Sequence, residues 1–289
     1  MSPQHSERRG DERHTDEQRK DGRRTDGRCT DGRCTDGRRT DGHRTDEHRT
    51  DGIGEQRDGS GARGGPARDG RRIDRPADLD AVRDSYDKVA DNYARMVRTT
   101  GLGDIRRHPW LKAAIDAFAD SVGDLGPVLD VGCGPGTVTG YLAERGLDVS
   151  GVDLSPRMVA NARRLYPRCR FEVASATELD LAEASFGGLL GWWSLFNLPR
   201  AILPQVFAHF AGALKPGGYL ITATHVGDED AARTEAYGGV PVRWTTHKWR
   251  PADYVRLIEE AGLHPVAELR LPADEQVGPG LVVMARRRL

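Results

Sequence analysis

A short apolar strand that runs directly into three alternate glycines constrains the fold of this chain most. Residues 128–131 read Val-Leu-Asp-Val, and Gly132, Gly134 and Gly136 follow before a helical pattern begins at Thr137. Glycine lacks a Cβ atom, so its backbone can adopt positive φ or approach a ligand closely. This strand, turn and helix predict the start of an open α/β sheet, in which ligands bind at the carboxyl ends of the strands.

Two carboxylates accompany the glycine turn and indicate the kind of ligand. Asp130 lies within the first strand, and Asp153 ends the next predicted strand, where a carboxylate can accept both hydroxyls of a ribose. The dinucleotide fingerprint requires a third glycine at the position of Thr137. A pyrophosphate would gain nothing from Asp130, whereas the ammonium group of an amino-acid ligand would. The pattern therefore favours a nucleoside joined to an amino acid over a dinucleotide.

The glycine run resembles the first motif of the class I S-adenosylmethionine (SAM)-dependent methyltransferases. Three further segments are similar to this family. Ser85–Ala94 resembles the Y-D-x-x-A-x-x-Y helix of its small-molecule methyltransferase subgroup. Residues 191–199 resemble the segment that leaves its fourth strand, and residues 214–218 resemble the turn before its fifth strand. The resemblance covers nearly all of residues 80–289. It implies SAM as cofactor and in-line transfer of its methyl group to a small-molecule acceptor.

The resemblance also implies a set of cofactor residues. Asp130 and the glycines are expected to hold the methionine part, and Asp153 the ribose hydroxyls. The family usually has an aspartate where this chain has Ser175, so we expect a weaker contact with the adenine edge there. The complete set is Tyr86, Tyr93, Asp130, Gly132, Cys133, Gly134, Gly136, Asp153, Leu154, Met158, Ser175, Ala176, Thr177 and Trp192.

The acceptor side is expected to comprise Trp193, Asn197, His225 and His247. His225 directly follows the fifth predicted strand, so it should emerge at the carboxyl edge of the sheet. Histidine titrates near neutral pH, which suits a general base. The alternative is that His225 only hydrogen-bonds the following loop. His247, in a long insertion over residues 225–250, is a second candidate, and relatives often have a histidine in place of Asn197.

Alternation of strand and helix predicts a doubly wound, mostly parallel, seven-stranded Rossmann-like sheet with a C-terminal antiparallel hairpin. Ser155 and Pro156 form a helix start, with the serine as N-cap. We expect a turn at 215–218. The predicted helices cover 80–97, 108–122, 137–145, 156–165, 204–214 and 251–261, and the predicted strands 126–131, 147–153, 170–174, 187–193, 219–224, 264–271 and 281–286.

Residues 1–75 differ sharply from the rest of the chain. They contain no aromatic residue, carry 19 Lys/Arg and 17 Asp/Glu, and repeat a pentapeptide from Thr25 onward. Such a segment buries too little apolar surface to offset its ordering entropy, so we predict a disordered low-complexity tail before a methyltransferase domain over 76–289. A weak tether to nucleic acid or membrane through its arginines, and a start codon assigned too early, are the alternatives.

Composition limits the remaining functional classes. Residues 76–289 carry 24 basic and 27 acidic side chains, so they have no net positive charge that would attract nucleic acid. No run of about 18 apolar residues is present, so we expect no membrane span. Without a signal-like apolar segment or metal-type cysteine spacing, we expect a cytoplasmic protein without a metal site. A protein acceptor, a nicotinamide-dependent oxidoreductase and a non-catalytic SAM-binding protein stay as alternatives.

Overall fold

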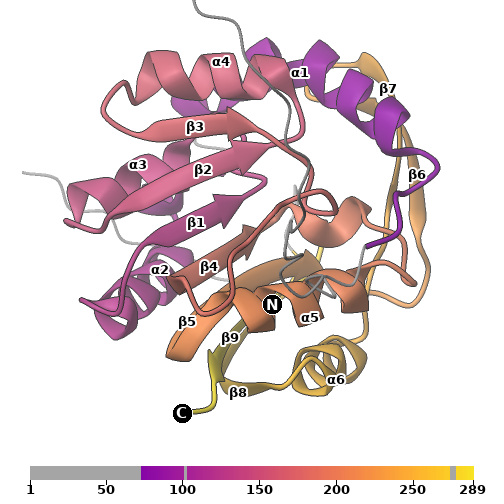
Figure 1. Cartoon of the computed structure of the whole chain (residues 1–289). Helices are drawn as coiled ribbons and strands as arrows, with labels where there is room; N and C mark the ends of the chain where they lie inside the picture. Colours follow the sequence, from indigo (N-terminus) through magenta and orange to yellow (C-terminus); the bar gives the residue numbers. More distant parts are fainter. Residues whose placement is uncertain (1–72, 101–102, 274–277) are drawn as a thin grey trace, which may run out of the picture. The chain divides into compact units, whose positions relative to one another are not determined.

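The computed structural model of the chain describes residues 73–100, 103–273 and 278–289. A seven-stranded sheet with the strand order β3-β2-β1-β4-β5-β9-β8 forms its centre (Figure 1). The first five strands in that order are parallel, and β9 lies antiparallel between β5 and β8. The strands are β1 (Val128–Val131), β2 (Val149–Asp153), β3 (Arg170–Val173), β4 (Phe186–Trp192), β5 (Leu214–His225), β6 (Ala231–Ala236), β7 (Val240–Thr246), β8 (Leu263–Leu271) and β9 (Gly280–Arg287). The doubly wound fold and its C-terminal hairpin are confirmed.

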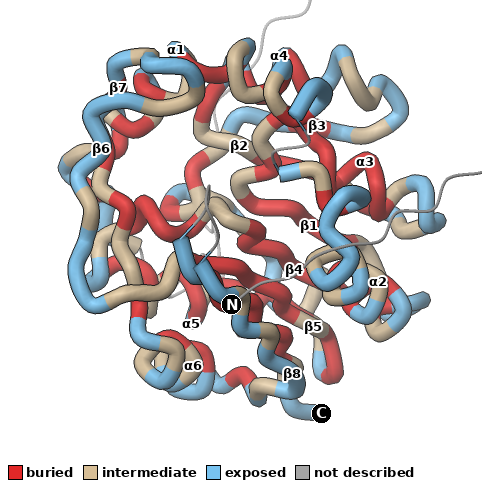
Figure 2. The backbone as a smooth tube through the Cα atoms, turned by 180° about the vertical axis from the view of Figure 1, so that it is seen from behind, coloured by how far each residue is buried: buried red, intermediate tan, exposed pale blue. Residues whose placement is uncertain are grey.

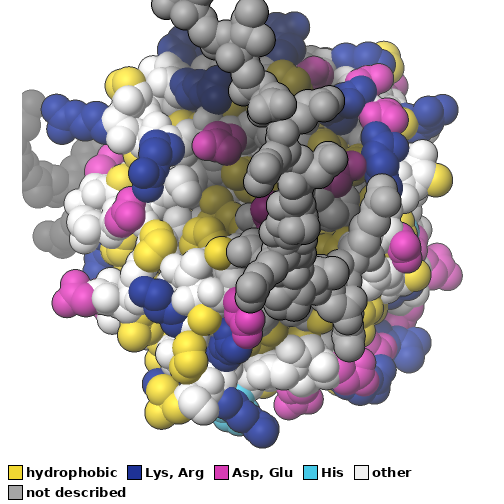
Figure 3. All heavy atoms as spheres, in the orientation of Figure 1, with side chains coloured by type: hydrophobic (Ala, Val, Ile, Leu, Met, Phe, Trp, Pro, Cys, Tyr) yellow, Lys and Arg dark blue, Asp and Glu magenta, His cyan; other side chains and the backbone are white. Residues whose placement is uncertain are grey.

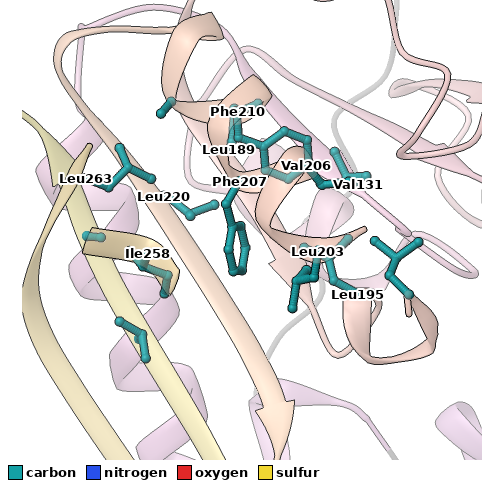
Figure 4. Close-up of a cluster of buried hydrophobic side chains, with 14 of the residues drawn as sticks. Val131, Leu189, Leu195, Leu203, Val206, Phe207, Phe210, Leu220, Ile258 and Leu263 are labelled. Carbon is teal, nitrogen blue, oxygen red and sulfur yellow. The ribbon is translucent and has the colours of Figure 1, made fainter. Parts of the chain in front are cut away.

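Helices cover both faces of the sheet. They are α1 (Leu79–Thr99), α2 (Pro109–Val122), α3 (Thr137–Glu144), α4 (Pro156–Leu165), α5 (Leu203–Ala213) and α6 (Pro251–Glu260), with short 3-10 turns η1 (Ile105–Arg107) and η2 (Leu195–Asn197). Successive side chains of a strand point to opposite faces. Leu189 and Leu220 accordingly pack with α5 and α6 (Figure 4), whereas Leu190 and Ile221 pack with α2 and α3. In Figure 2, nearly all of β4 and most of β5 are buried.

Local sequence signals explain where α4 begins and where α6 ends. The hydroxyl of Ser155 accepts a hydrogen bond from the backbone N–H of Met158 (3.1 Å), and Pro156 occupies the first position of α4. This is the predicted N-cap. Gly262 follows α6 with φ +87°, a conformation that favours glycine.

Two details differ from the sequence-based expectation. Residues 215–218 form no separate turn but an irregular part of β5, because Phe186 pairs with Leu214 and Gly188 with Tyr219 across a register shift. The apolar residues of the helix predicted over 108–122, Trp110 among them, are expected to face the core, but Trp110 is 73% exposed. The buried side of α2 begins at Ile115, so Trp110 in the first turn extends beyond the core.

The insertion over 225–250 contains the antiparallel hairpin β6–β7, which lies beside α1 (Figure 1). Arg233 pairs with Trp244 in its register. The backbone N–H of Arg243 donates to the Ser85 hydroxyl (2.9 Å), and the Trp244 ring stacks on Tyr86 (centroids 4.7 Å apart, planes 5° apart). The hairpin is therefore packed against α1 by both polar and aromatic contacts.

The predicted tail lies outside the described residues up to residue 72, so its disorder and its alternatives stay predictions. Ile73 packs on the core, and Asp74 and Gln205 exchange two hydrogen bonds of 3.2 Å. The packed domain thus includes Ile73 to Arg75, slightly before the predicted boundary. Among the described residues, no helix has the length and apolar character needed to cross a membrane. Basic and acidic side chains are interspersed on the face drawn in Figure 3.

Candidate active site

The glycine turn after β1 has one packed side and one open side. Gly132 has φ +77°, and a Cβ there would lie 2.2 Å from the Cβ of Ser194. Gly134 has φ +55°, and among the described residues only Tyr93, at 3.7 Å, would come within 4 Å of its Cβ. Gly132 is thus required by packing. Gly134 leaves room for a ligand beside Tyr93.

Asp153 at the end of β2 is joined to this turn. One carboxylate oxygen accepts the backbone N–H of Gly134 (2.8 Å), and the other accepts that of Ser155 (2.9 Å). Burial raises the pKa of Asp153 to about 6, although both N–H donors act in the opposite direction. Each oxygen has a further lone pair, so the oriented carboxylate can still accept ribose hydroxyls.

Asp130 is almost wholly buried, with 1% exposure. The Thr139 hydroxyl donates to its Oδ2 (2.7 Å), while its Oδ1 has no hydrogen-bond partner among the described residues. Burial raises the pKa of Asp130 to about 6, against the effect of Thr139 and with a smaller contribution from the charge of Asp153. A buried carboxylate oxygen without a partner fits a cationic donor such as the SAM ammonium.

Tyr86 and Tyr93 reach the site from α1. The Tyr86 hydroxyl donates to Asn197 Oδ1 (2.7 Å), and Asn197 Nδ2 donates to the carbonyl of Thr245 (3.0 Å). Burial raises the pKa of Tyr86 well above its usual value, which keeps it a donor. Tyr93 packs on Tyr237 at 4.7 Å. Both polar groups of Asn197 are therefore used to join α1, η2 and β7.

The residues predicted to contact the adenine comprise two apolar side chains and a short hydrogen-bonded segment. Met158 is buried, with Leu154 partly buried in the same cluster. The hydroxyls of Ser175 and Thr177 lie 2.9 Å apart, and the Thr177 N–H donates to Ser175 (3.2 Å). These hydroxyls bind each other, and Ala176 between them packs against the main core cluster, so the contact of Ser175, Ala176 and Thr177 with adenine stays a prediction.

Two of the predicted cofactor residues have side chains directed into the core. Cys133 packs with Ala162 and Phe171, and Trp192 packs with Ile115 and other residues of the α2 face. Burial raises the pKa of the Cys133 thiol well above its ordinary value. These side chains support the turn and the end of β4, and their predicted role in cofactor binding stays a prediction.

The acceptor-side residues do not all lie in equivalent surroundings. The His225 ring lies between Trp193 (centroids 5.0 Å apart) and Phe196 (4.7 Å), and its nitrogens have no hydrogen-bond partner among the described residues. Burial, followed by the charges of Arg233 and Lys248, lowers its pKa to about 4. His225 is thus neutral at pH 7.

His247, the second candidate, is engaged elsewhere. Its Nδ1 lies 2.7 Å from Asp230 Oδ2, and its backbone N–H donates to the carbonyl of Phe196 (2.8 Å). Asp230 also accepts from Arg200 (2.7 Å). This network occupies the nitrogen of His247 that faces Asp230.

Sequence reasoning missed several residues of the site. Thr139 hydrogen-bonds Asp130, while Arg233, Tyr237 and Trp244 come from a hairpin that was expected only as an insertion. The pair Gly238-Gly239 between two short β-type runs was the available signal, since a glycine pair is typical of hairpin turns.

Comparison with known proteins agrees with this geometry. Residues 128–218 match the family model described as "Methyltransferase domain". The demethylmenaquinone methyltransferase of Beutenbergia cavernae is 33% identical over 48% of this chain and 55% of its own length. The N-demethylindolmycin N-methyltransferase of Streptomyces griseus is 28% identical over 50% of this chain and 73% of its own. The chain spans little more than half the length of the first curated relatives it matches.

Solved structures agree at the level of the fold. The magnesium protoporphyrin IX methyltransferase from Synechocystis PCC 6803 with bound SAM superposes with a TM-score of 0.56 and 18% identity, covering 74% of this chain and 98% of that chain. The described residues have the fold of the class I SAM-dependent methyltransferases. The segment that matches the methyltransferase domain model, residues 128–218, contains the glycine turn, Asp130 and Asp153.

Proposed function

We propose that this protein binds SAM and transfers its methyl group to a small-molecule acceptor. One observation carries the proposal: Asp130, two residues before Gly132, presents a buried carboxylate oxygen that has no partner within the described residues, and the N–H of Gly134 in the same turn orients Asp153. This arrangement supplies an acceptor for an ammonium and an acceptor for a ribose diol on adjacent strands. A dinucleotide pyrophosphate would find a negative charge at Asp130 instead.

Each residue then has a defined part in binding. Asp130 takes the ammonium, Asp153 takes the ribose hydroxyls, and the open side of Gly134 admits the ligand beneath Tyr93. Leu154 and Met158 provide the apolar contact for the base. Bound SAM supplies an electrophilic methyl group on a sulfonium.

The protein's own contribution to the transfer is alignment of two bound reactants and removal of a proton where the acceptor has one. His225 lies at the end of β5, and its ring nitrogens have no hydrogen-bond partner in the part of the chain that the structure describes, which supports it as the proton acceptor. With a pKa of about 4 it is unprotonated at pH 7 but a weak base, so it suits an acceptor whose proton is already acidic. The alternative, a histidine that only packs between two aromatic rings, is separated from this by the kinetics described below.

The acceptor is proposed to be a small molecule because the names of two relatives refer to small molecules, demethylmenaquinone and N-demethylindolmycin. A disordered tail before the domain and a cytoplasmic location stay predictions made from the sequence. A protein acceptor and a non-catalytic SAM-binding protein are outcomes of the experiment.

Calorimetry with SAM, S-adenosylhomocysteine and NAD tests the cofactor. We expect the first two to bind and NAD not to bind. Hydrogen bonds to a charged group contribute about 1.5–3 kcal/mol each, so Asp153→Ala should weaken SAM binding roughly ten- to a hundred-fold. Asp148→Ala is the matched control, because Asp148 precedes β2 and its carboxylate forms an exposed ion pair with Arg170.

Labelled SAM incubated with metabolite and protein extracts then identifies the acceptor. A labelled small molecule supports the proposal, and a labelled protein or no labelled product contradicts its acceptor class or its catalysis. NAD binding by the wild type, or unchanged SAM affinity in Asp153→Ala, would refute the cofactor assignment.

A further inference from the structure

Trp193 has a backbone conformation that bulky residues rarely adopt. It directly follows β4 with φ +50°. Of the three non-glycine residues with positive φ in the described part of the chain, Trp193 and Tyr237 both flank the candidate active site. Such conformations cost free energy and persist where the surrounding structure or function requires them. Gly280 accommodates the indole, since a Cβ there would lie 2.5 Å from Trp193 Cη2.

Trp193, Phe196 and His225 form an aromatic wall at the carboxyl edge of the sheet. The His225 ring meets Trp193 at 52° and Phe196 at 72°. The wall lies next to the cofactor turn because β4 pairs directly with β1, and β5 with β4 (Figure 1). Aromatic rings in tilted contact provide a flat apolar surface that favours another ring.

Arg233 contributes a positive charge from the hairpin. Residues paired across an antiparallel ladder project to the same face, so Arg233 lies on the face of Trp244, which stacks on Tyr86. Arg233 is nevertheless exposed. No salt bridge or hydrogen bond of its guanidinium is present within the described residues. The Arg233 side chain thus lies on the hairpin face that carries Trp244, is exposed, and has no charged partner within the described residues.

Lys248 contributes a second charge beside the wall. The Trp249 N–H donates to the carbonyl of His225 (3.0 Å), and Val226 pairs with Trp249 in a parallel bridge, which places Lys248 alongside His225. Its ammonium has no ion pair among the described residues. The charges of Arg233 and Lys248 both act on the His225 ring, where they reinforce the effect of burial on its pKa.

The neighbouring carboxylates do not neutralise these two cations. Asp228 pairs with Arg250 (2.5 Å), and Asp230 pairs with Arg200 and His247, both at 2.7 Å. Arg233 and Lys248 are therefore cations beside the aromatic wall that no ion pair within the described residues neutralises.

We propose that the methyl acceptor is an aromatic molecule that carries an anionic group, with its ring on the aromatic wall and its anion between Arg233 and Lys248. That the bound molecule is the methyl acceptor rests on the proposed function. Binding of such a molecule at this site can be tested without catalysis. An aromatic cation and a non-aromatic anion each satisfy only half of the site.

Three probes of similar size separate these requirements: 4-hydroxybenzoate, cyclohexanecarboxylate and benzylammonium. Their affinities are measured by calorimetry on the full chain, alone and saturated with S-adenosylhomocysteine. We expect 4-hydroxybenzoate to bind at least about fivefold more tightly than cyclohexanecarboxylate, and benzylammonium to bind most weakly, because ring stacking and charge both favour the first.

Variants locate the binding. Arg233→Gln combined with Lys248→Gln should weaken 4-hydroxybenzoate about tenfold or more, since both charged partners of the anion are removed. Arg243→Gln on β7 is the matched control and should leave this affinity unchanged. Trp193→Leu should remove the preference for the aromatic acid, and Gly280→Ala, which displaces the indole without deleting it, should reduce that preference.

The outcomes distinguish this proposal from the proposed function. Loss of 4-hydroxybenzoate binding in the double variant with unchanged S-adenosylhomocysteine affinity supports it. Equal binding of all three probes, no binding of any probe, or an affinity unaffected by the double variant would overturn it. Failure of the wild type to bind SAM would refute the cofactor assignment alone, since the probes are also measured without cofactor.

Discussion

Asp130→Asn separates the cost of the buried carboxylate from its role in binding. The carboxylate is 1% exposed, and its Oδ1 has no partner among the described residues. Asparagine has nearly the same shape, and its carbonyl oxygen can still accept from Thr139. The substitution therefore removes the charge and keeps the hydrogen bond that positions the side chain.

The magnitude follows from the pKa of Asp130, which burial raises from 3.8 to about 6. The folded protein binds more protons than the unfolded chain between about pH 4 and 6, so the free energy of unfolding falls as pH rises through this window. Above it, the ionised group destabilises the ligand-free protein by up to about 3 kcal/mol. Asparagine lacks this dependence, whereas Asp153 titrates in both proteins and its contribution differs only by its smaller charge interaction with Asp130.

Thermal unfolding of ligand-free wild type and variant at pH 4.5 and 7.5 measures the difference. The difference in Tm, variant minus wild type, should be larger at pH 7.5 than at pH 4.5. The increase should be about 2–4 °C for each kcal/mol by which the ionised Asp130 destabilises the wild type. SAM affinity at pH 7.5 should fall about tenfold or more, since the charged partner of the ammonium is lost. Asp148→Asn, at the surface, is the control. A Tm difference that is the same at both pH values would refute the reasoning.

Three further changes test other parts of the site. At saturating SAM, the acidic limb of the turnover profile should lie near pH 4, where His225 becomes protonated, and His225→Ala should lower turnover by about 10²–10⁴; near-normal turnover would make the ring structural. Tyr86→Phe removes the hydroxyl that donates to Asn197 (2.7 Å) and should lower stability by about 1 kcal/mol in urea unfolding, with SAM affinity altered less than in Asp153→Ala. Deletion of residues 1–72 should leave the Tm and saturated turnover unchanged, and a loss of several degrees would contradict the predicted disordered tail.

The parts of the site that depend on strand ends were predictable from the sequence. Asp130, Asp153 and His225 each lie at the carboxyl end of an apolar run, and parallel strands bring such ends to one edge. The helix start at Ser155 was predictable for a different reason: the N-cap serine and the proline that follows it are adjacent in sequence. The irregular pairing at 215–218 was not, since it depends on how Phe186 and Gly188 pair with β5.

Contacts between distant segments account for what sequence reasoning missed. Tyr86 was predicted as a cofactor residue, but its hydrogen bond to Asn197, 111 residues away in sequence, was not predictable. The glycine pair Gly238-Gly239 could have indicated the hairpin but not the position of Arg233, because that position depends on the register with Trp244 and on the packing of the hairpin against α1. Similarly, His225 was expected to titrate near neutral pH, and its lowered pKa arises from burial and from charges that lie elsewhere in the chain.

Helix α1 links the two halves of the site. On the cofactor side, Asp87 accepts from the N–H of Arg157 (3.1 Å) and from the Ser155 hydroxyl, which ties α1 to the start of α4 directly after Asp153. On the acceptor side, Tyr86 stacks on Trp244 of the hairpin that also carries Arg233. Since one helix holds both contacts, displacement of α1 disturbs the surroundings of Asp153 and of Arg233 together. The order of cofactor and acceptor binding should therefore depend on the packing of α1 as well as on the residues that touch either ligand.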